Sequence, residues 1–538
     1  MKIKLTDNWS FPLTPLQFFL LVILVLGIFF RFVNLERKVY WHDEAYTSLR
    51  ISGYTSAEVE EHVFKGQVIG IEDLQKYLRP NPEKGLVETI NALAIDDAQH
   101  PPFYYIVVRL WVQWFGSSVA VTRSLSVLIS LLVFPCVYYL CLELFESPLV
   151  GWVAIALIAV SPFHVLYAQE AREYSLWTVT ILLSSWSLLR ALRVTTQSRA
   201  NRVRDWGMYG ITFVLSLYTS SLSLLVGIGQ GIYVIVIERF RLTKAVVSYF
   251  IASLIALLLF APWLAIASAT WSQTGATWTA IPIPFIDWIK TWGLHVNRAF
   301  ILTVEDFGFD NIWTYLSLPF FLSVVGYAIY FICRQTTSKV WLFVLTLMGI
   351  PALALALPDL IWGGQRSTST RYLIPFLLGI QLSVAYLLAT QITSASFLKR
   401  KFWQVVMAAV ISVGVVSCTI SSQAETSWNK VVSYHNHQVA RIVNQSKAPL
   451  LISNSFGINF GNALALSYLL EPKVRLQIVT GNTQPDFMNI PNIPQGFSDV
   501  FFLNPSDQFR EKIEQKYNWT LKLIFNDSHL WLWKRVKG

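Results

Sequence analysis

Two adjacent carboxylates, Asp43 and Glu44, lie just beyond the first strongly apolar segment, Leu16 to Phe32. A carboxylate can act as a general base that removes the proton of an attacking hydroxyl group. Acidic residues in the first turn of a helix also complement its dipole, so this structural interpretation stays open. Their place where the chain leaves the apolar segment predicts Asp43, with Glu44 beside it, as the catalytic pair.

Three further polar groups combine residue types that suit phosphate chemistry. They are His100-Pro-Pro-Phe-Tyr-Tyr105, Gln169-Glu-Ala-Arg-Glu-Tyr174 and the stretch from Gln365-Arg366 to Arg371-Tyr372. Arginine presents a planar fork of donors that matches a phosphate and stays charged at physiological pH. The predicted substrate-binding residues are His100, Tyr104, Glu170, Arg172, Tyr174, Arg366, Arg371 and Tyr372.

Each of these groups also has a purely structural interpretation. Arg172 and Arg371 could be anchors that reach any lipid phosphate. His100 could be a turn residue before two prolines, and Glu170 could belong to a local ion-pair network. The combination of carboxylates, histidine and arginines from four distant segments favours a common site.

The composition places these groups in a membrane protein. The 538 residues are 54% hydrophobic and only 14% charged, with a mean hydropathy of +0.47. Soluble proteins carry roughly 25% charged residues, so most of this chain must face lipid. The net charge of +10 is explained by basic loops beside apolar spans, and therefore requires no nucleic-acid partner. The four cysteines lie inside apolar spans with no zinc-site spacing.

The apolar segments predict a polytopic α-helical membrane protein with about eleven spans, since a spanning helix needs roughly 20 apolar residues. The first segment has no small-residue cleavage site and is interpreted as an uncleaved span. The shorter segment Pro101 to Phe115 is interrupted by Arg109 and Gln113, and is predicted to be an interfacial helix, with a twelfth span as the alternative. The predicted spans are 16–33, 121–143, 149–166, 174–193, 206–220, 222–238, 246–267, 312–333, 340–357, 371–391 and 403–421.

The charges of the loops favour eleven spans over twelve. With eleven spans and an inside N terminus, every basic cluster, from Arg199 to Lys401, lies on the inner side, as the positive-inside rule requires. A twelfth span at Pro101 to Phe115 would move the clusters to the outside. The four candidate groups then share the outer face of a multi-pass plasma or inner membrane.

The same topology predicts the domains. Residues 1–421 form a transmembrane module with a large outer loop at 34–120, in which 43–51 and 56–64 are expected to be helical. Residues 422–538 are expected to form a small extracytoplasmic α/β domain. It is predicted to have a helix over 428–444 and strands at 449–452, 474–479, 499–503, 521–525 and 530–533.

The order of these motifs resembles a known family. An apolar span, Asp43-Glu44-Ala45, His-Pro-Pro-x-Tyr-Tyr, Gln-Glu-Ala-Arg-x-Tyr and Arg-Tyr-Leu-x-Pro are similar to GT-C membrane glycosyltransferases. The similar branch contains protein O-mannosyltransferases and the aminoarabinose transferases of lipid A, called glycosyltransferase family 39. The resemblance covers roughly residues 10–390.

The resemblance implies a GT-C fold and an inverting transferase that moves a sugar from a polyprenyl-phosphate donor to a lipid, glycan or protein hydroxyl. It implies that Asp43 is the base or acceptor positioner. Glu170 and Arg172 would lie near the donor phosphate, as would Arg371. His100 would correspond to the histidine that opens the first-loop helix. No nucleotide-binding motif is present in the sequence.

Three questions stay open at this level. The acids allow a Mg²⁺ or Mn²⁺ site, although no metal ligand is assigned. A lipid or glycan transporter is a rival function, as is a non-catalytic scaffold with an outer binding domain. A transporter predicts ionisable residues near the middle of its spans, whereas here they lie at one face.

Overall fold

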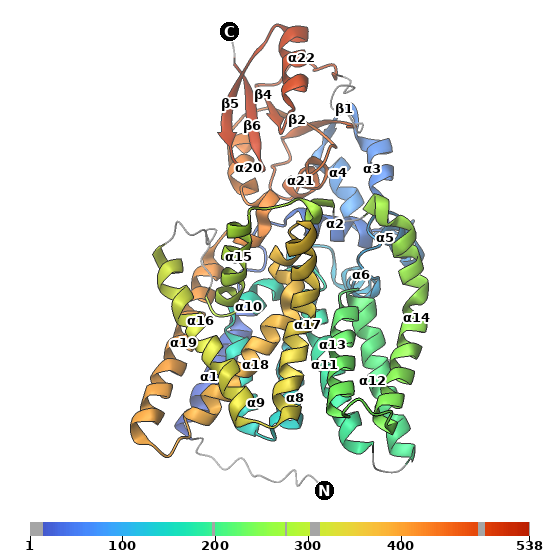
Figure 1. The fold of residues 1–538 in the computed structure, drawn as a ribbon. Helices are drawn as coiled ribbons and strands as arrows, with labels where there is room; N and C mark the ends of the chain where they lie inside the picture. Colours follow the sequence, from blue (N-terminus) through green and yellow to red (C-terminus); the bar gives the residue numbers. More distant parts are fainter. Residues whose placement is uncertain (1–13, 196–198, 275–276, 302–311, 482–489, 537–538) are drawn as a thin grey trace.

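The computed structural model describes residues 14–195, 199–274, 277–301, 312–481 and 490–536. A helical bundle carries a smaller sheet-containing part at one end (Figure 1). The bundle helices are α1 (Pro15–Phe32), α7 (Val119–Leu131), α8 (Val133–Phe145), α9 (Pro148–Ala159), α10 (Pro162–Ala168), α11 (Tyr174–Val194), α12 (Arg199–Thr219), α13 (Ser223–Ile237), α14 (Lys244–Thr274), α16 (Ile312–Gln335), α17 (Ser338–Trp362), α18 (Ile374–Gln391) and α19 (Phe397–Gln423).

The bundle follows the eleven predicted spans. Among the described residues, eight helices are long and apolar enough to cross a membrane, or nine when the bent pair α9 and α10 counts as one. The other two predicted spans correspond to α12 and the shorter apolar α13. A polar pair between them is satisfied inside the bundle, where Gln230 accepts a hydrogen bond from Tyr209 at 3.0 Å. Packing against neighbouring helices therefore stabilises these two spans, whose composition or length alone does not mark them as membrane-spanning.

The third predicted span, 149–166, is not one straight helix. α9 and α10 meet at an angle of 63°, because Pro162 supplies no backbone N–H to continue α9. The buried Arg31 donates to the carbonyl oxygens of Ala159 at 2.7 Å and Ile158 at 3.1 Å. A side chain from α1 thus satisfies carbonyl groups that the break would leave unpaired.

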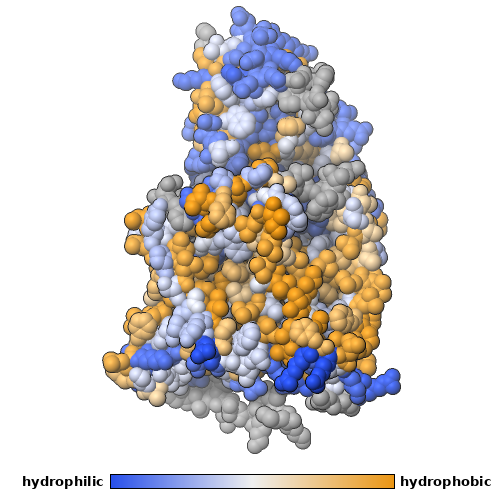
Figure 2. Space-filling view, viewed as in Figure 1, coloured by the Kyte–Doolittle hydropathy of each residue, from blue (hydrophilic) through white to orange (hydrophobic). Residues whose placement is uncertain are grey.

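A hydrophobic surface surrounds the bundle between two polar ends. Figure 2 shows it as an orange zone between the hydrophilic sheet-containing part and hydrophilic residues at the opposite end. The predicted basic clusters lie at the helix ends away from the sheet, where α12, α14, α17 and α19 begin. The chain therefore has the surface of a membrane protein, with the basic clusters of its short loops at the end away from the sheet.

The first loop is mainly helical. It contains α2 (His42–Ile51), α3 (Ser56–Val63), α4 (Ile71–Gln75), η1 (Lys76–Leu78), α5 (Leu86–Asp96) and α6 (Phe103–Phe115). The two predicted helices at 43–51 and 56–64 are confirmed by α2 and α3. The segment 101–115 forms α6, which packs on α2, α5, α7 and α12. This helix is not among the candidate membrane spans of the described residues, in agreement with the eleven-span topology.

Residues 422–538, called the tail, supply five strands of a six-stranded mixed sheet in the order β1-β3-β2-β4-β6-β5. Its strands β2 (Pro449–Asn454), β3 (Arg475–Val479), β4 (Asp499–Leu503), β5 (Thr520–Asn526) and β6 (Trp531–Val536) confirm the five predicted strands. β2 is parallel to β3 and β4. The sixth strand, β1 (Lys65–Gly70), comes from the first loop and pairs antiparallel with β3. The tail sheet is therefore completed by a segment about 400 residues earlier in the chain.

The helices around the sheet differ from the prediction in two ways. The expected helix over 428–444 is interrupted, giving η5 (Trp428–Ser433) and α20 (Asn436–Asn444). Val431 has a φ of 21°, which breaks the helical path. Two unpredicted helices, α21 (Asn459–Leu466) and α22 (Asp507–Tyr517), cover the sheet. One hydrophobic core joins the first loop to the tail, since Leu49 of α2 and Phe64 pack with Phe460 of α21.

Candidate functional site

Asp43 lies where the first loop meets the bundle. It is in the first turn of α2, and its Oδ2 accepts a hydrogen bond from Nη1 of Arg371 at 2.7 Å. Arg371 belongs to η4 (Thr370–Leu373), which leads directly into α18. Burial raises the pKa of the Asp43 carboxyl, but the charge of Arg371, the hydrogen bond to His42 and the charge of Arg172 together outweigh burial and hold that pKa well below its usual range. Asp43 is therefore an ionised carboxylate paired with a guanidinium group.

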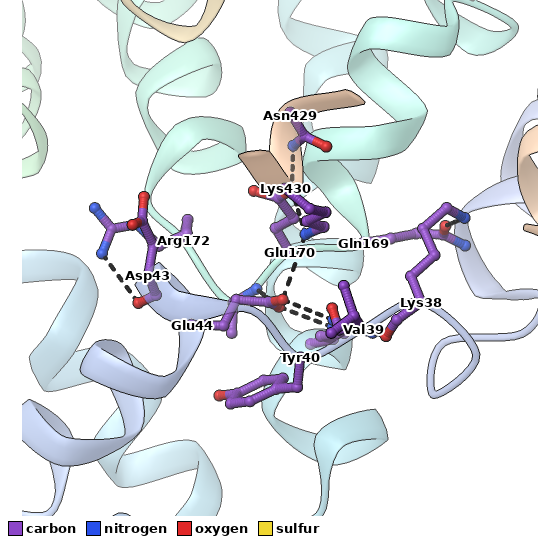
Figure 3. Close-up of polar contacts among 12 residues, drawn as sticks. Lys38, Val39, Tyr40, Asp43, Glu44, Gln169, Glu170, Arg172, Asn429 and Lys430 are labelled. Atoms are coloured by element: carbon purple, nitrogen blue, oxygen red, sulfur yellow. Dashed lines mark hydrogen bonds and ion pairs between the residues drawn. The ribbon is translucent and has the colours of Figure 1, made fainter. Parts of the chain in front are cut away.

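Arg172 is the second arginine beside Asp43 (Figure 3). Its Nη1 donates to the Asp43 carbonyl oxygen at 3.5 Å and to the Tyr105 hydroxyl at 3.1 Å. Its Nη2 lies 3.0 Å from Nε2 of His100. Because arginine only donates, Nε2 of His100 must accept, which leaves Nδ1 to donate to Glu173 at 3.0 Å. This arrangement fixes the tautomer of the histidine and the position of Arg172.

Glu173 balances the charge of Arg172. Its Oε2 lies 3.4 Å from Nε of Arg172. Burial raises the pKa of Glu173, but the charge of Arg172 and the hydrogen bond from His100 outweigh that effect and lower it to about 2. The predicted residues His100 and Arg172 thus form one connected group with Asp43.

Glu44 points away from this group into a buried ion-pair network (Figure 3). Successive residues of a helix differ by about 100° in direction, so the two acids of α2 reach different neighbours. Arg123 of α7 donates to both Glu44 oxygens, at 2.8 and 2.6 Å, and the Ala171 N–H donates at 2.8 Å. Burial raises the pKa of Glu44, whereas Arg123 and Lys430 lower it, with a net decrease. Glu44 therefore fixes α2 to α7 and to the 169–174 turn.

Glu170 extends the same network toward the tail. Lys430 of η5 donates to its Oε1 at 2.6 Å and lies 3.4 Å from Oε2 of Glu44. Asn429 also donates to Oε1 of Glu170. Burial is the largest influence on the pKa of Glu170 and raises it, although Lys430 opposes the change. Lys430 therefore connects two acids that are distant in sequence.

Tyr174 offers the clearest unsatisfied group at the site. Its hydroxyl is buried and has no hydrogen-bond partner among the described residues. The guanidinium carbons of Arg172 and Arg371 each lie 5.9 Å from the centre of its ring. The same guanidinium of Arg371 lies 5.5 Å from the ring centre of Tyr372. A buried hydroxyl without a partner is costly, so a ligand oxygen at this point would satisfy it.

Two predicted residues lie elsewhere. The hydroxyl of Tyr104 bonds to Ser126 of α7 at 2.7 Å, inside the protein core. Arg366 of η3 (Arg366–Thr368) pairs with Asp359 of α17 at 3.1 Å. The structure therefore gives both side chains partners that hold helices together, and their substrate-binding role stays a prediction.

Several residues of the network were not predicted from the sequence. Arg123 and Lys430 are the cations that hold Glu44 and Glu170. A third is Lys38, which donates to Gln169 at 3.0 Å. Burial, with the charges of Arg123 and Lys430, lowers the pKa of Lys38 to about 7. The one available signal was a charged residue in apolar surroundings, as at Arg123 in the second predicted span.

The four acids at the site all have cationic partners, and a divalent metal site among them stays a prediction from the sequence. Within the described ranges, no three His, Cys, Asp or Glu side chains are grouped as metal ligands. Each of the four acids instead lies against a cationic side chain. The pairs are Asp43 with Arg371, Glu44 with Arg123, Glu170 with Lys430 and Glu173 with Arg172.

Comparisons with known proteins were made at the level of sequence families and folds. Residues 99–266 match a family model described as dolichyl-phosphate-mannose-protein mannosyltransferase. A search of curated protein sequences finds no match. The structure is similar to ArnT from Cupriavidus metallidurans in the apo state, with a TM-score of 0.52 and 12% identity. That similarity covers 97% of this chain and 98% of that one.

Two further structures are similar at a lower level. ArnT from Cupriavidus metallidurans bound to undecaprenyl phosphate matches with a TM-score of 0.47 and 13% identity, over 96% of this chain and 98% of that one. The Archaeoglobus fulgidus oligosaccharyltransferase in its apo form matches with a TM-score of 0.49 and 12% identity, over 94% of this chain and 70% of that one.

Proposed function

We infer that this chain is a membrane glycosyltransferase with the GT-C fold, and we propose that it transfers a sugar from a polyprenyl-phosphate donor to an acceptor hydroxyl. The resemblance predicted from the motifs is confirmed by the fold shared with ArnT and by the mannosyltransferase-type segment 99–266. The description of that family names a dolichyl-phosphate-linked mannose, which supports a lipid-phosphate donor.

One observation carries the assignment of the site. Asp43 contacts two arginines from distant segments, Arg371 through its carboxylate and Arg172 through its backbone carbonyl oxygen. The Tyr174 hydroxyl, whose ring lies near both guanidinium groups, has no partner among the described residues. A transferase of this kind needs a base for the acceptor and cations for the departing phosphate. Asp43 can supply the first, while Arg371 and Arg172 can supply the second.

The proposed step balances without a metal or nucleotide. The acceptor oxygen attacks the anomeric carbon as the bond from that carbon to the phosphate oxygen breaks. The acceptor proton passes to Asp43, and the configuration at the anomeric carbon inverts. The polyprenyl phosphate that leaves carries the bonding electron pair and is stabilised by Arg371 and Arg172.

The pair formed by Asp43 and Arg371 has to loosen during this step. As long as Arg371 donates to it, the carboxylate is a weak base, because its pKa is far below neutral. A donor phosphate would compete for the guanidinium group, which would raise the pKa of Asp43. Binding of the donor would therefore activate the base that the acceptor needs.

We further propose that the sheet end of the molecule faces the outside of a plasma or inner membrane. The basic clusters at the opposite end support this orientation through the positive-inside rule. The site at Asp43 and the tail would then both be extracytoplasmic. A transporter or a scaffold is not favoured, because the connected acids and arginines lie where the first loop and tail meet the bundle.

The test uses the purified full-length protein in lipid nanodiscs with a panel of undecaprenyl-phosphate and dolichyl-phosphate sugars. We expect release of the lipid phosphate with at least one donor, and a loss of about 100-fold or more in Asp43→Asn. Asp507→Asn, at an exposed acid of α22, is the matched control and should keep wild-type activity. Turnover by Asp43→Asn at the wild-type rate would overturn the assignment of the base.

A further inference from the structure

A cavity lies between the tail sheet and the segment that connects the tail to the bundle. Its volume is about 220 Å³. One wall is formed by Trp428 and, in the following turn, Tyr434 and His435. The other wall is the turn between β5 and β6, with Asp527, Ser528 and His529. Figure 1 shows this region where β5, β6 and α20 approach the bundle.

Trp428 connects this cavity to the site around Asp43. The guanidinium of Arg298 lies over the Trp428 ring at 3.8 Å from its centre. Arg298 belongs to α15 (Phe285–Arg298) and donates to Thr370 at 2.7 Å, one position before Arg371. Lys430, two residues after Trp428, reaches Glu170. The cavity therefore adjoins the proposed catalytic site on the side of the tail.

Two residues that line the cavity carry buried ring nitrogens without a partner in the described part of the chain. Among the described residues, the buried Nδ1 of His435 and the buried Nε1 of Trp428 make no hydrogen bond. Nε2 of His435 lies 3.6 Å from Oδ1 of Asp527. The backbone of Asp527 is held separately, through a bond from its N–H to the carbonyl oxygen of Leu530 at 2.9 Å. The Ser528 hydroxyl donates to Oδ2 of Asp527 at 3.4 Å. A carboxylate has about four acceptor sites, so it can also accept from a ligand.

The backbone beside the cavity is strained. Val431, which also lines it, has a φ of 21° and a ψ of −89°. A β-branched residue rarely adopts such a conformation, and strain of this kind persists where the surroundings enforce it. Here Lys430 is held by Glu170 on one side, while the turn into His435 forms the cavity wall on the other.

We propose that this cavity binds a neutral sugar unit of the acceptor, so that the acceptor is a glycan or glycolipid. This inference rests on the proposed glycosyl transfer and names its acceptor class. The lining combines aromatic faces with a carboxylate, a hydroxyl and ring nitrogens, which are groups that stack on and hydrogen-bond to a polyhydroxyl ring. Its described lining residues include no Lys or Arg, and they therefore do not suit a phosphate.

The size of the cavity also limits the ligand. Pockets for drug-sized ligands begin at roughly 300 Å³, so this cavity suits one sugar ring. A ring held against Trp428 would lie next to Arg298 and Thr370, so that the adjoining part of the acceptor could extend toward Asp43. The cavity would thus hold the acceptor in place by a unit other than the reacting hydroxyl.

The test measures binding of free sugars, separately from turnover. Full-length protein in nanodiscs without glycoside detergent is titrated with methyl glycosides of mannose, glucose, galactose, N-acetylglucosamine and arabinose, and with a Ser/Thr-containing peptide. Saturation-transfer NMR reports the contacts. We expect saturable binding of at least one glycoside, weakened about 10-fold or more by Asp527→Ala, because a hydrogen bond to a charged group is lost.

Controls separate this inference from the proposed function. Asp507→Ala should bind the glycoside as wild type does, while Asp527→Asn provides a conservative variant if Asp527→Ala does not fold. Undecaprenyl phosphate binding, measured by thermal shift, should be weakened by Arg371→Ala but not by Asp527→Ala. If Arg371→Ala leaves undecaprenyl phosphate binding unchanged while the glycosides bind as expected, the proposed catalytic site alone is contradicted.

Two results would overturn the acceptor inference itself. One is the absence of glycoside binding in protein that still binds the donor. The other is binding of the peptide, in place of the glycosides, with the same sensitivity to Asp527→Ala. Glycoside binding that is equal in wild type and both Asp527 variants would place the sugar elsewhere and also overturn it.

Discussion

Asp43 and Arg371 are 328 positions apart in the chain, yet their side chains form a hydrogen bond of 2.7 Å. The pair joins the first turn of α2 to the segment before α18. A guanidinium that neutralises the carboxylate in the resting protein can transfer its bonds to an incoming phosphate. The pair therefore suggests how donor binding and base strength are coupled.

Replacing Arg371 by Ala should change both donor affinity and pH dependence. The donor KM should rise about 10- to 100-fold, because a charge-assisted hydrogen bond to the phosphate is lost. Removal of the positive charge should also raise the pKa of Asp43, so the acidic limb of the pH–rate profile should move to higher pH. Arg193→Ala, at an exposed arginine near the far end of α11, is the matched control. An unchanged acidic limb would contradict the coupling.

His100 is predicted to act as a positioning residue for Arg172. His100→Leu removes the acceptor for Nη2 of Arg172, so the donor KM should rise about 10-fold, with a smaller change in kcat. His100→Gln can still accept a hydrogen bond and should restore part of the affinity. Steady-state kinetics of the two variants provide the measurement. Equal defects in both would indicate that His100 acts in some other way.

The pair of Glu44 and Arg123 should dominate the stability of the junction between the first loop and the bundle. Glu44→Gln leaves a buried guanidinium without its counter-charge, which costs about 3–5 kcal/mol. The double variant Glu44→Leu with Arg123→Met should lose less than the sum of its single variants. Thermal unfolding in detergent gives the comparison, and additive losses would contradict a specific pairing.

Lys38 should make stability depend on pH in the neutral to alkaline range. Its pKa is about 7 in the folded protein, against 10.5 for the free side chain. Between these values the unfolded chain binds the proton and the folded protein does not, so its contribution to stability rises with pH. Below about pH 7 the Lys38 side chain is charged in both the folded and the unfolded chain, so the folded protein bears the full penalty of burying that charge.

The corresponding variant is Lys38→Met. It should stabilise the protein relative to wild type at pH 6 and lose most of that advantage by pH 9.5. Melting temperatures at the two pH values provide the measurement. The variant lacks the hydrogen bond to Gln169 at both pH values, which lowers its melting temperature equally at each. This loss therefore does not affect the comparison between the two pH values. A constant difference between variant and wild type would show that Lys38 does not titrate in this range.

The sequence by itself determined the membrane class, the helical spans and most tail strands. These follow from local composition and periodicity, since a run of apolar residues forms a helix in lipid whatever its neighbours are. The candidate residues His100, Arg172 and Arg371 were also recognised locally, because charged groups next to apolar spans are costly unless they are used. The bundle confirms the spans and brings these residues to Asp43.

Only the tertiary structure decided the roles of the two neighbouring acids. Asp43 and Glu44 are equivalent as sequence, but their directions on α2 differ, and their partners come from α7, the 169–174 turn, η4 and η5. The pairing of β1 with β3 is similarly distant in sequence. Such contacts depend on how whole elements pack, and no local pattern encodes them. The fold therefore places Asp43 near the Tyr174 hydroxyl, unpartnered among the described residues, whereas it encloses Glu44 with the cations Arg123 and Lys430.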